Sequence, residues 1–190
     1  MLLISIAVIS LLLGAVVCLG CDAFLTYVWL WLLPVSALGF FLILLLLGFL
    51  FLLYLCKRVD QSVPQEDDSR FYRIVTNLII ESAFPVLRIH VRKSGTKKVP
   101  ADGRFMLVCN HQSNADPVLL LEAFADHQLA FISKRENQDM FLIGKIMHKL
   151  MCQMVNREND REALKTILKC IQLLKDDEVN IGVFPEGYCT

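Results

Sequence analysis

Charged side chains are almost absent from the first 56 of the 190 residues. Asp22 is the only acidic residue in this segment, and no lysine or arginine precedes Lys57. A bilayer core accommodates about 20 apolar residues in each helix, so the segment is long enough for two passes and too long for one. We therefore predict a membrane segment over residues 1–56, with helices over about 2–20 and 34–56 and a polar break at Asp22.

Positive charge begins directly after the second predicted helix, at Lys57 and Arg58. The positive-inside rule then predicts an integral protein of the cell membrane whose C-terminal part lies in the cytoplasm. Two alternatives stay open. One is a single long span, tilted or re-entrant and broken at Pro34. The other is a cleaved signal peptide, although no basic region precedes the first apolar run.

Cysteine and histidine are not arranged in the patterns of metal ligands. Three of the seven cysteines, Cys18, Cys21 and Cys56, lie in the apolar segment, and those other than Cys18 and Cys21 have neither paired spacing nor accompanying histidines. We interpret them as small buried apolar residues or free thiols in a reducing compartment. The sequence also has no recognisable nucleic-acid-binding motif, so we expect neither a metal nor a nucleic-acid partner.

Beyond the apolar segment, the sequence predicts a linker and then a domain. Residues 60–69 are polar and contain a proline, which is typical of a linker. We place the linker at 57–70 and the domain at 71–190. The domain begins with a helical pattern that would end at Pro85 and would either lie on lipid headgroups or cover the domain core. The apolar residues of this pattern are Phe71, Ile74, Val75, Leu78 and Ile79.

After this helix, apolar runs and helical patterns alternate along the domain. Such alternation predicts an α/β fold with a sheet that is mostly parallel in its centre. Ligands of such sheets bind beyond the carboxyl ends of the strands. The predicted strands are 86–91, 104–109, 129–132, 153–155 and 179–184. The predicted helices begin at Pro117 and cover 139–151 and 160–174.

Basic side chains gather around the first predicted strands, where Asp102 is the only acid. They are Arg88, Arg92, Lys93, Lys97, Lys98 and Arg104. This cluster favours an anionic surface such as a membrane that contains acidic lipids. A solvated hairpin between the first two strands explains it equally well.

A histidine and an aspartate lie five residues apart where the strand 104–109 ends. Asp116 stands just before Pro117, which suits the N-cap of the next helix. A carboxylate there can accept a hydrogen bond from one ring nitrogen of His111, fix the tautomer and leave the other nitrogen basic toward a substrate hydroxyl. A helix cap without activity is the alternative. A metal-dependent hydrolase would need more ligands than the sequence provides.

The segment 110–116 resembles the His-x4-Asp block of the glycerolipid acyltransferases, the family typified by 1-acyl-sn-glycerol-3-phosphate acyltransferase. Residues 184–187, Phe-Pro-Glu-Gly, are similar to the acceptor-binding block of that family. Between these blocks, residues 131–136, Gly144 and residues 155–157 follow the order and rough spacing of its intermediate block. The resemblance covers about 71–190. It implies a membrane hairpin followed by an acyltransferase-like α/β domain.

The activity that this resemblance implies is transfer of a fatty acyl group in phospholipid biosynthesis. The donor would be an acyl-carrier-protein or coenzyme A thioester, and the acceptor would be the free hydroxyl of lysophosphatidate or a related lysophospholipid of the membrane. His111 would act as general base and Asp116 would hold its tautomer. No acyl-enzyme and no cofactor are expected, so Ser113 and Cys109 are not predicted nucleophiles.

Acceptor binding is also implied by the resemblance. The phosphate of the acceptor needs cationic or backbone donors, and Arg157 is the first candidate, followed by Lys134. Glu186 and Gly187 would shape the acceptor site, because glycine permits close approach of the backbone. Alternatively, the two cations belong to an ordinary surface, and 184–187 is a plain exit from a strand.

Two features depart from the family pattern. The acceptor block of the family commonly continues Glu-Gly-Thr-Arg, whereas residues 186–190 here are Glu-Gly-Tyr-Cys-Thr. The phosphate-binding arginine of that block is therefore missing, which leaves the headgroup of the acceptor open. In addition, the family domain continues beyond this block, so we expect the sequence to be an N-terminal fragment with a C-terminally incomplete domain. The alternative to an enzyme is a membrane-anchored noncatalytic fragment with a binding role or none.

Overall fold

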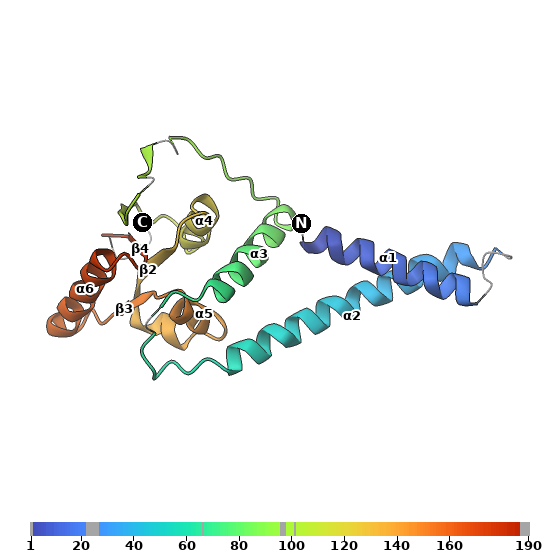
Figure 1. Cartoon of the computed structure of the whole chain (residues 1–190), viewed down its shortest axis with the longest axis horizontal. Helices are drawn as coiled ribbons and strands as arrows, with labels where there is room; N and C mark the ends of the chain where they lie inside the picture. Colours follow the sequence, from blue (N-terminus) through green and yellow to red (C-terminus); the bar gives the residue numbers. More distant parts are fainter. Residues whose placement is uncertain (1, 22–26, 66, 96–97, 101, 187–190) are drawn as a thin grey trace. The chain divides into compact units, whose positions relative to one another are not determined.

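The computed structural model describes residues 2–21, 27–65, 67–95, 98–100 and 102–186. The chain divides into two compact units, Met1–Arg58 and Val59–Thr190. Figure 1 shows the first unit as a pair of helices and the second as a sheet with helices around it. The predicted polar break at Asp22 lies outside the described residues.

Two long apolar helices, α1 (Leu2–Gly20) and α2 (Trp29–Lys57), form the first unit and pack against each other. Both are long and apolar enough to cross a membrane. The second helix begins earlier than the predicted residue 34, and Pro34 lies in its second turn without breaking it. A proline is tolerated in an apolar helix because it removes only one backbone donor and neighbouring groups satisfy the freed carbonyl.

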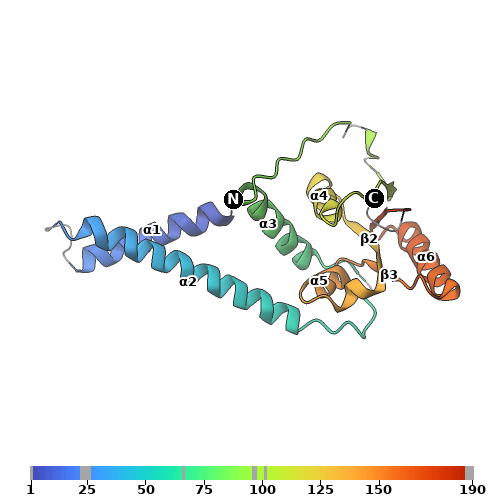
Figure 2. The same ribbon diagram turned by 180° about the vertical axis from the view of Figure 1, so that it is seen from behind.

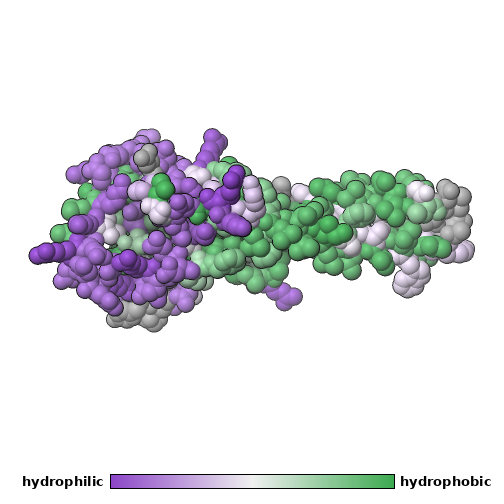
Figure 3. Space-filling view, turned by 90° about the horizontal axis from the view of Figure 1, so that it is seen from below, coloured by the Kyte–Doolittle hydropathy of each residue, from purple (hydrophilic) through white to green (hydrophobic). Residues whose placement is uncertain are grey.

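Small side chains line the contact between α1 and α2. Ser10, Gly14 and Cys18 recur at every fourth position of α1, and these three residues are buried. A Cβ at Gly14 would lie 3.0 Å from Ser36 Oγ and 3.3 Å from Ala37 Cβ. Small residues of this kind allow close helix packing in lipid. The large apolar side chains point outward instead, and Figure 3 shows this unit covered by hydrophobic residues.

A four-stranded parallel sheet forms the centre of the second unit. Its order is β1-β4-β2-β3, and all three strand pairs are parallel. The strands are β1 (Met106–Val108), β2 (Leu129–Lys134), β3 (Gln153–Val155) and β4 (Asn180–Val183). The helices are α3 (Arg70–Val86), α4 (Asp116–Ala123), η3 (Arg135–Asp139), α5 (Ile143–Lys149) and α6 (Asp160–Lys175). The predicted α/β fold with a parallel sheet is therefore confirmed.

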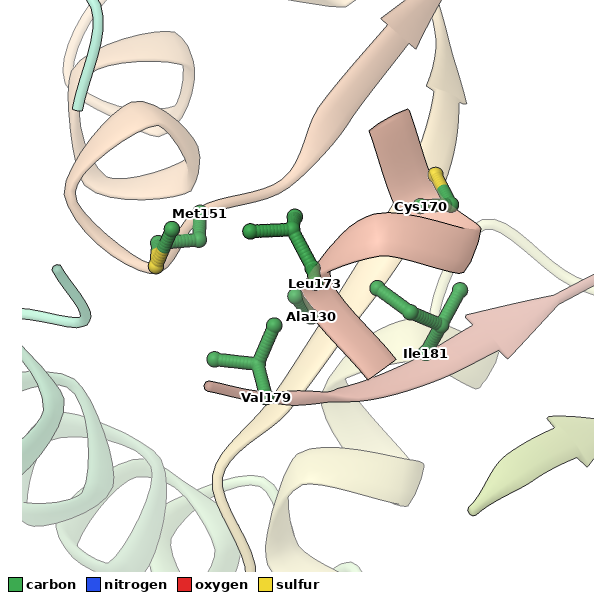
Figure 4. Packing of buried hydrophobic residues seen from close by; sticks show 6 residues of the cluster. All are labelled: Ala130, Met151, Cys170, Leu173, Val179 and Ile181. Carbon is green, nitrogen blue, oxygen red and sulfur yellow. The ribbon is translucent and has the colours of Figure 1, made fainter. Parts of the chain in front are cut away.

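Helices cover both faces of this sheet. Figures 1 and 2 show α6 on one side and α3, α4 and α5 on the other. The core lies between α6 and the central strands, as Figure 4 shows. Its buried side chains are Ala130, Met151, Cys170, Leu173, Val179 and Ile181. The helix predicted over 160–174 is confirmed as α6, which begins where the Asn159 side chain accepts hydrogen bonds from the N–H groups of Arg161 and Glu162.

The strand predicted over 86–91 is wrong, and so is the hairpin that would have carried the basic cluster. Helix α3 continues past Pro85 and ends in a Schellman motif. Arg88, with φ of 56°, takes the left-handed position, its N–H donates to Pro85 O at 3.2 Å, and Ile89 N–H donates to Phe84 O at 2.8 Å. The alternating apolar residues do not form a strand here, because the N–H groups of Arg88 and Ile89 already donate hydrogen bonds to the end of the helix.

None of the apolar residues predicted for α3 is fully buried, because Phe71, Ile74 and Ile79 are exposed and Val75 and Leu78 are half-buried. Phe71 and Ile74 are 50% and 49% exposed, whereas the buried face includes Arg73, Ile80 and Phe84. Hydrogen bonds of Arg73 explain why this face of α3 is the buried one. The Arg73 guanidinium donates two hydrogen bonds to the Asp68 carboxylate, at 2.7 and 2.6 Å, and a third to Leu129 O at 3.0 Å. This buried ion pair turns the opposite stripe of the helix toward the domain.

The helix predicted over 139–151 is shorter than expected. The 3₁₀ helix η3 and the short α5 replace it, because Leu142 between them has φ of 63° and interrupts the helical path. The strand predicted over 153–155 matches β3. The other predicted strands are confirmed with changed ends.

Candidate active site

The strand order places two distant loops side by side. β1 and β4 are adjacent, with Val108 opposite Val183, and Cys109 N–H donates to Val183 O at 3.2 Å. The chain therefore leaves both strands at the same edge of the sheet. His111 follows β1 and Glu186 follows β4, so residues 75 positions apart in the sequence meet there.

His111 and Asp116 are in direct contact. His111 Nδ1 lies 3.1 Å from Asp116 Oδ2, and the two side chains are 17% and 19% exposed. Because a carboxylate only accepts hydrogen bonds, Nδ1 carries the proton, and the neutral ring then has a basic Nε2. The arrangement can thus accept a proton from a substrate hydroxyl.

The Asp116 carboxylate is stabilised as an anion. Oδ2 also accepts hydrogen bonds from Gln112 N–H at 2.7 Å and Ser113 N–H at 2.8 Å. Burial acts to raise the pKa of Asp116, but the hydrogen bonds from Ser113, His111 and Gln112 outweigh burial and hold this pKa below its usual value. The carboxylate therefore stays charged beside the imidazole at neutral pH.

The predicted N-cap role of Asp116 is wrong. Ala115 is the N-cap residue of α4, and Asp116 is already in the first turn of the helix. The Asp116 side chain faces back toward the loop that precedes it, where it accepts the backbone hydrogen bonds of that loop. Asp116 therefore shapes the His111 loop rather than the helix end.

Glu186 fixes the backbone of the histidine loop. Glu186 Oε2 accepts a hydrogen bond from His111 N–H at 3.1 Å, and this bond joins the exits of β1 and β4. Gly187, the other residue predicted for the acceptor site, lies outside the described residues.

An aromatic stack supports His111 and was not predicted from the sequence. The His111 ring stacks on Phe184, with centroids 4.4 Å apart and planes 27° apart, and Phe184 stacks on Phe131 at 5.9 Å and 10°. Gly182 leaves room for this stack, because a Cβ there would lie 2.6 Å from ring carbons of Phe131. The signal in the sequence is Gly182, a small residue in the middle of a buried strand.

Lys134 and Arg157 lie at the same edge of the sheet but farther along it. Lys134 is the last residue of β2, Arg157 follows β3 by two residues, and both are exposed. With neighbouring strands about 4.8 Å apart, the ends of β2 and β3 are roughly 10 and 14 Å from the end of β1. The structure therefore places the two cations along one edge with His111, not in its immediate surroundings.

The nearby thiol is a poor nucleophile. Burial, followed by the Asp116 carboxylate, raises the pKa of Cys109. A thiol with a raised pKa is protonated at neutral pH, and the thiolate is the reactive form. Within the described ranges, no group of three or more histidine, cysteine or acidic residues is placed to hold a metal ion. The chemistry of this edge thus centres on the imidazole.

The fold and the site define a class of protein: an α/β domain with a His–Asp pair at the carboxyl edge of a parallel sheet. The family model described as Acyltransferase matches residues 90–190, which are more than half of the chain. The chain belongs to this acyltransferase family, and the resemblance to glycerolipid acyltransferases is confirmed.

Proteins of known sequence and structure support the same family. A probable 1-acyl-sn-glycerol-3-phosphate acyltransferase of Mycoplasma pneumoniae is 30% identical over 67% of this chain and 48% of its own length. The 1-acyl-sn-glycerol-3-phosphate acyltransferase of Bacillus subtilis is 31% identical over 53% of this chain and 49% of its own. The chain thus spans about half the length of the curated relatives that it matches.

The fold is similar to that of a solved structure. The crystal structure of the 1-acyl-sn-glycerophosphate acyltransferase PlsC from Thermotoga maritima matches with a TM-score of 0.53 and 24% identity. The match covers 74% of this chain and 53% of that chain. At this identity the likeness establishes the fold, and the chemistry is argued from the site itself.

Proposed function

We propose that this protein transfers a fatty acyl group from an acyl-carrier-protein or coenzyme A thioester to the free hydroxyl of lysophosphatidate or a related lysophospholipid. The observation that carries the proposal is the Nδ1···Oδ2 contact between His111 and Asp116, which leaves Nε2 basic at the edge where ligands of parallel sheets bind. The names of the relatives support the substrate class.

The proposed reaction is a single displacement. Nε2 of His111 takes the proton of the acceptor hydroxyl while that oxygen attacks the thioester carbonyl. The new C–O ester bond forms, the C–S bond breaks, and the leaving thiolate receives the proton from the imidazolium. Asp116 stabilises the imidazolium through Nδ1, Phe184 stacks on the ring, and Glu186 holds the His111 backbone.

The proposed location is the membrane that holds the acceptor. Helices α1 and α2 would cross it as a hairpin, because both are apolar and their large side chains point outward. Lys57 and Arg58 at the end of α2 favour a cytoplasmic α/β unit, where soluble thioester donors are available.

The test is an acyl-transfer assay of the chain in vesicles, with lysophosphatidate and either acyl-coenzyme A or acyl-carrier protein. His111→Ala should lower kcat by roughly 100- to 10,000-fold, the usual share of general base catalysis. His90→Ala, at an exposed histidine outside the site, is the matched control and should keep wild-type activity. Wild-type transfer by His111→Ala would reject His111 as the general base, whereas absence of transfer by the wild-type chain would favour a noncatalytic membrane protein.

Arg157 is the proposed contact for the acceptor phosphate, with Lys134 as the second cation. Arg157→Ala should raise the acceptor KM and leave the donor KM nearly unchanged, because only the acceptor headgroup would lose a partner. Arg157→Lys should restore part of the effect, since an ammonium cannot form a bidentate contact with phosphate. Equal losses with phosphate-bearing and phosphate-free acceptors would mean that Arg157 has a structural role.

A further inference from the structure

Three large apolar side chains are exposed on one loop of the α/β unit. The loop joins η3 to α5, and Met140, Phe141 and Ile143 are 46%, 75% and 48% exposed. Single exposed apolar residues are ordinary on a protein surface. Three of them within one short loop form a patch, and such patches mark contacts with other molecules or with membranes.

The surrounding structure fixes the shape of this loop. Leu142 has φ of 63°, a left-handed conformation that a leucine adopts only where its surroundings impose it. A Cβ at Gly144 would overlap the Gln138 carbonyl, so glycine allows the two ends of the loop to close on each other. Gly144 N–H then donates to Met140 O at 2.9 Å. The apolar side chains are therefore presented by a closed, preorganised loop.

Hydrogen bonds join the base of the loop to the segment that directly follows α2. Lys145 Nζ donates to Val59 O at 3.3 Å, and Gln61 Nε2 donates to Gln138 O at 3.1 Å. Val59 is two residues beyond Lys57, the last residue of α2, and two residues span at most about 7 Å. Chain continuity alone thus keeps the base of the loop close to the point where the chain leaves the apolar hairpin.

We propose that Met140, Phe141 and Ile143 insert among the lipid headgroups of the membrane that holds α1 and α2. This inference rests on the membrane location proposed above. Apolar side chains beside basic ones bind such interfaces, and Lys145 at the loop base matches anionic headgroups. The site of insertion is the η3–α5 loop.

The position of the η3–α5 loop relates its membrane contact to the His111 site. The 3₁₀ helix η3 follows β2 directly, so the loop lies beyond the carboxyl end of that strand. His111 follows the carboxyl end of β1 in the same parallel sheet. Insertion of the loop would therefore bring the edge that carries the imidazole toward the lipid surface, where a lysophospholipid resides.

A fluorescence measurement on the full chain tests this inference. Both native tryptophans, Trp29 and Trp31, are replaced by phenylalanine, and Phe141→Trp then supplies the only indole. The control is Lys175→Trp in the same background, because Lys175 is an exposed polar residue at the end of α6, on the other face of the sheet. The chains are placed in vesicles of equal parts phosphatidylcholine and phosphatidylglycerol, with or without brominated acyl chains.

Brominated lipid should quench the Phe141→Trp emission severalfold more than the Lys175→Trp emission, and Ile143→Trp should repeat the result. Equal quenching of both probes by aqueous iodide, with no effect of brominated lipid, would overturn the inference. Carbonate extraction separates the two levels of the argument. A chain that stays in the membrane with a water-exposed loop refutes the loop contact alone, whereas a chain that is extracted refutes the hairpin and the loop contact together.

Discussion

At the level of single residues, Asp116 both orients the His111 ring and fixes the loop that precedes it. The same oxygen accepts a hydrogen bond from the His111 ring and two from backbone N–H groups of the loop between them. The five-residue spacing was enough to predict the pair, because one short loop separates His111 from Asp116 at the start of α4. The backbone bonds could not be predicted, since they depend on the turn that the loop takes.

Asp116→Asn should impair turnover by roughly 100-fold or more, because an amide can donate to Nδ1 and so favour the tautomer with a protonated Nε2.

The pH dependence of stability gives a second readout for the same substitution. The pKa of Asp116 is lowered by folding, so its stabilising effect is complete above the ordinary value of 3.8 and is lost as the pH falls through the lowered value. The difference in melting temperature between wild type and variant should shrink below about pH 4.

The control for this experiment is Asp126→Asn, at an exposed aspartate outside the site. It should leave turnover and its pH profile unaltered. An Asp116→Asn variant that melts earlier but keeps the specific activity of the wild type would assign Asp116 to structure alone.

Gly182 and Phe131 form a size-matched pair beneath the imidazole. Gly182→Ala should destabilise the α/β unit by about 1–3 kcal/mol, because its methyl group would displace the Phe131 ring and the stack above it. Phe131→Leu in the same chain should recover part of that loss. A double-mutant cycle of unfolding free energies measures the coupling. Additive effects of the two substitutions would exclude this packing relation.

At the level of elements, four of the five predicted strands were found, whereas the strand order was not predictable. Periodicity and length mark β2, β4 and α6 because their apolar residues face one core. The insertion of β4 between β1 and β2 depends on pairing across the whole domain. For this reason the stack on Phe184 and the Glu186 contact were missed, although both residues belong to a motif seen in the sequence.

Helix α3 shows a second limit of periodicity. Its apolar stripe was identified, yet the buried Arg73–Asp68 pair selects the opposite stripe for contact with the domain. It ends at Val86, one residue after the predicted Pro85, and a Schellman motif with Arg88 in the left-handed position closes it where a strand was expected. The hydrophobic pattern shows only which residues burial would favour, whereas the buried face and the end of α3 depend on hydrogen bonds.

Packing of α1 on α2 yields a prediction at this scale. Gly14→Leu should separate the helices, because Ser36 and the Ala37 backbone already lie 3.0 and 3.2 Å from the position of its Cβ. Gly48→Leu is the matched control, since no atom lies within 4 Å of a Cβ there. In a chain whose other cysteines are replaced by alanine, a membrane-permeant maleimide should label Cys18 faster in Gly14→Leu only. Equal labelling in both variants would argue against close packing at Gly14.

At the level of the whole α/β unit, one ion pair joins three segments. Asp68 comes from the region predicted as a linker, Arg73 from α3, and the carbonyl of Leu129 from the start of β2. The two charged side chains are only 9% and 2% exposed. The segment before α3 is therefore part of the folded unit, which a reading of its polar composition could not reveal.

Arg73→Met should lower the stability of this unit by about 3–5 kcal/mol, because it leaves the Asp68 carboxylate buried without its partner. Hydrogen exchange of the β2 amides in the full chain would measure the loss. The exposed pair between Arg135 and Glu162 provides the comparison, and Arg135→Met should cost no more than about 1 kcal/mol. Similar exchange in the two variants would contradict the structural importance of the Arg73 contact.

The late position of β4 in the chain has a consequence for biosynthesis. β4 follows β2 and β3 in the sequence, yet among the described strands it is the one that pairs with β1. During translation this pairing of β1 must therefore wait until residues 180–183 have been made. Long-range pairing of this kind slows folding and leaves strand edges open to aggregation. The hydrogen bond from His111 N–H to Glu186 joins the exits of the same two strands, so the histidine loop gains this support only after β2 and β3 have been made.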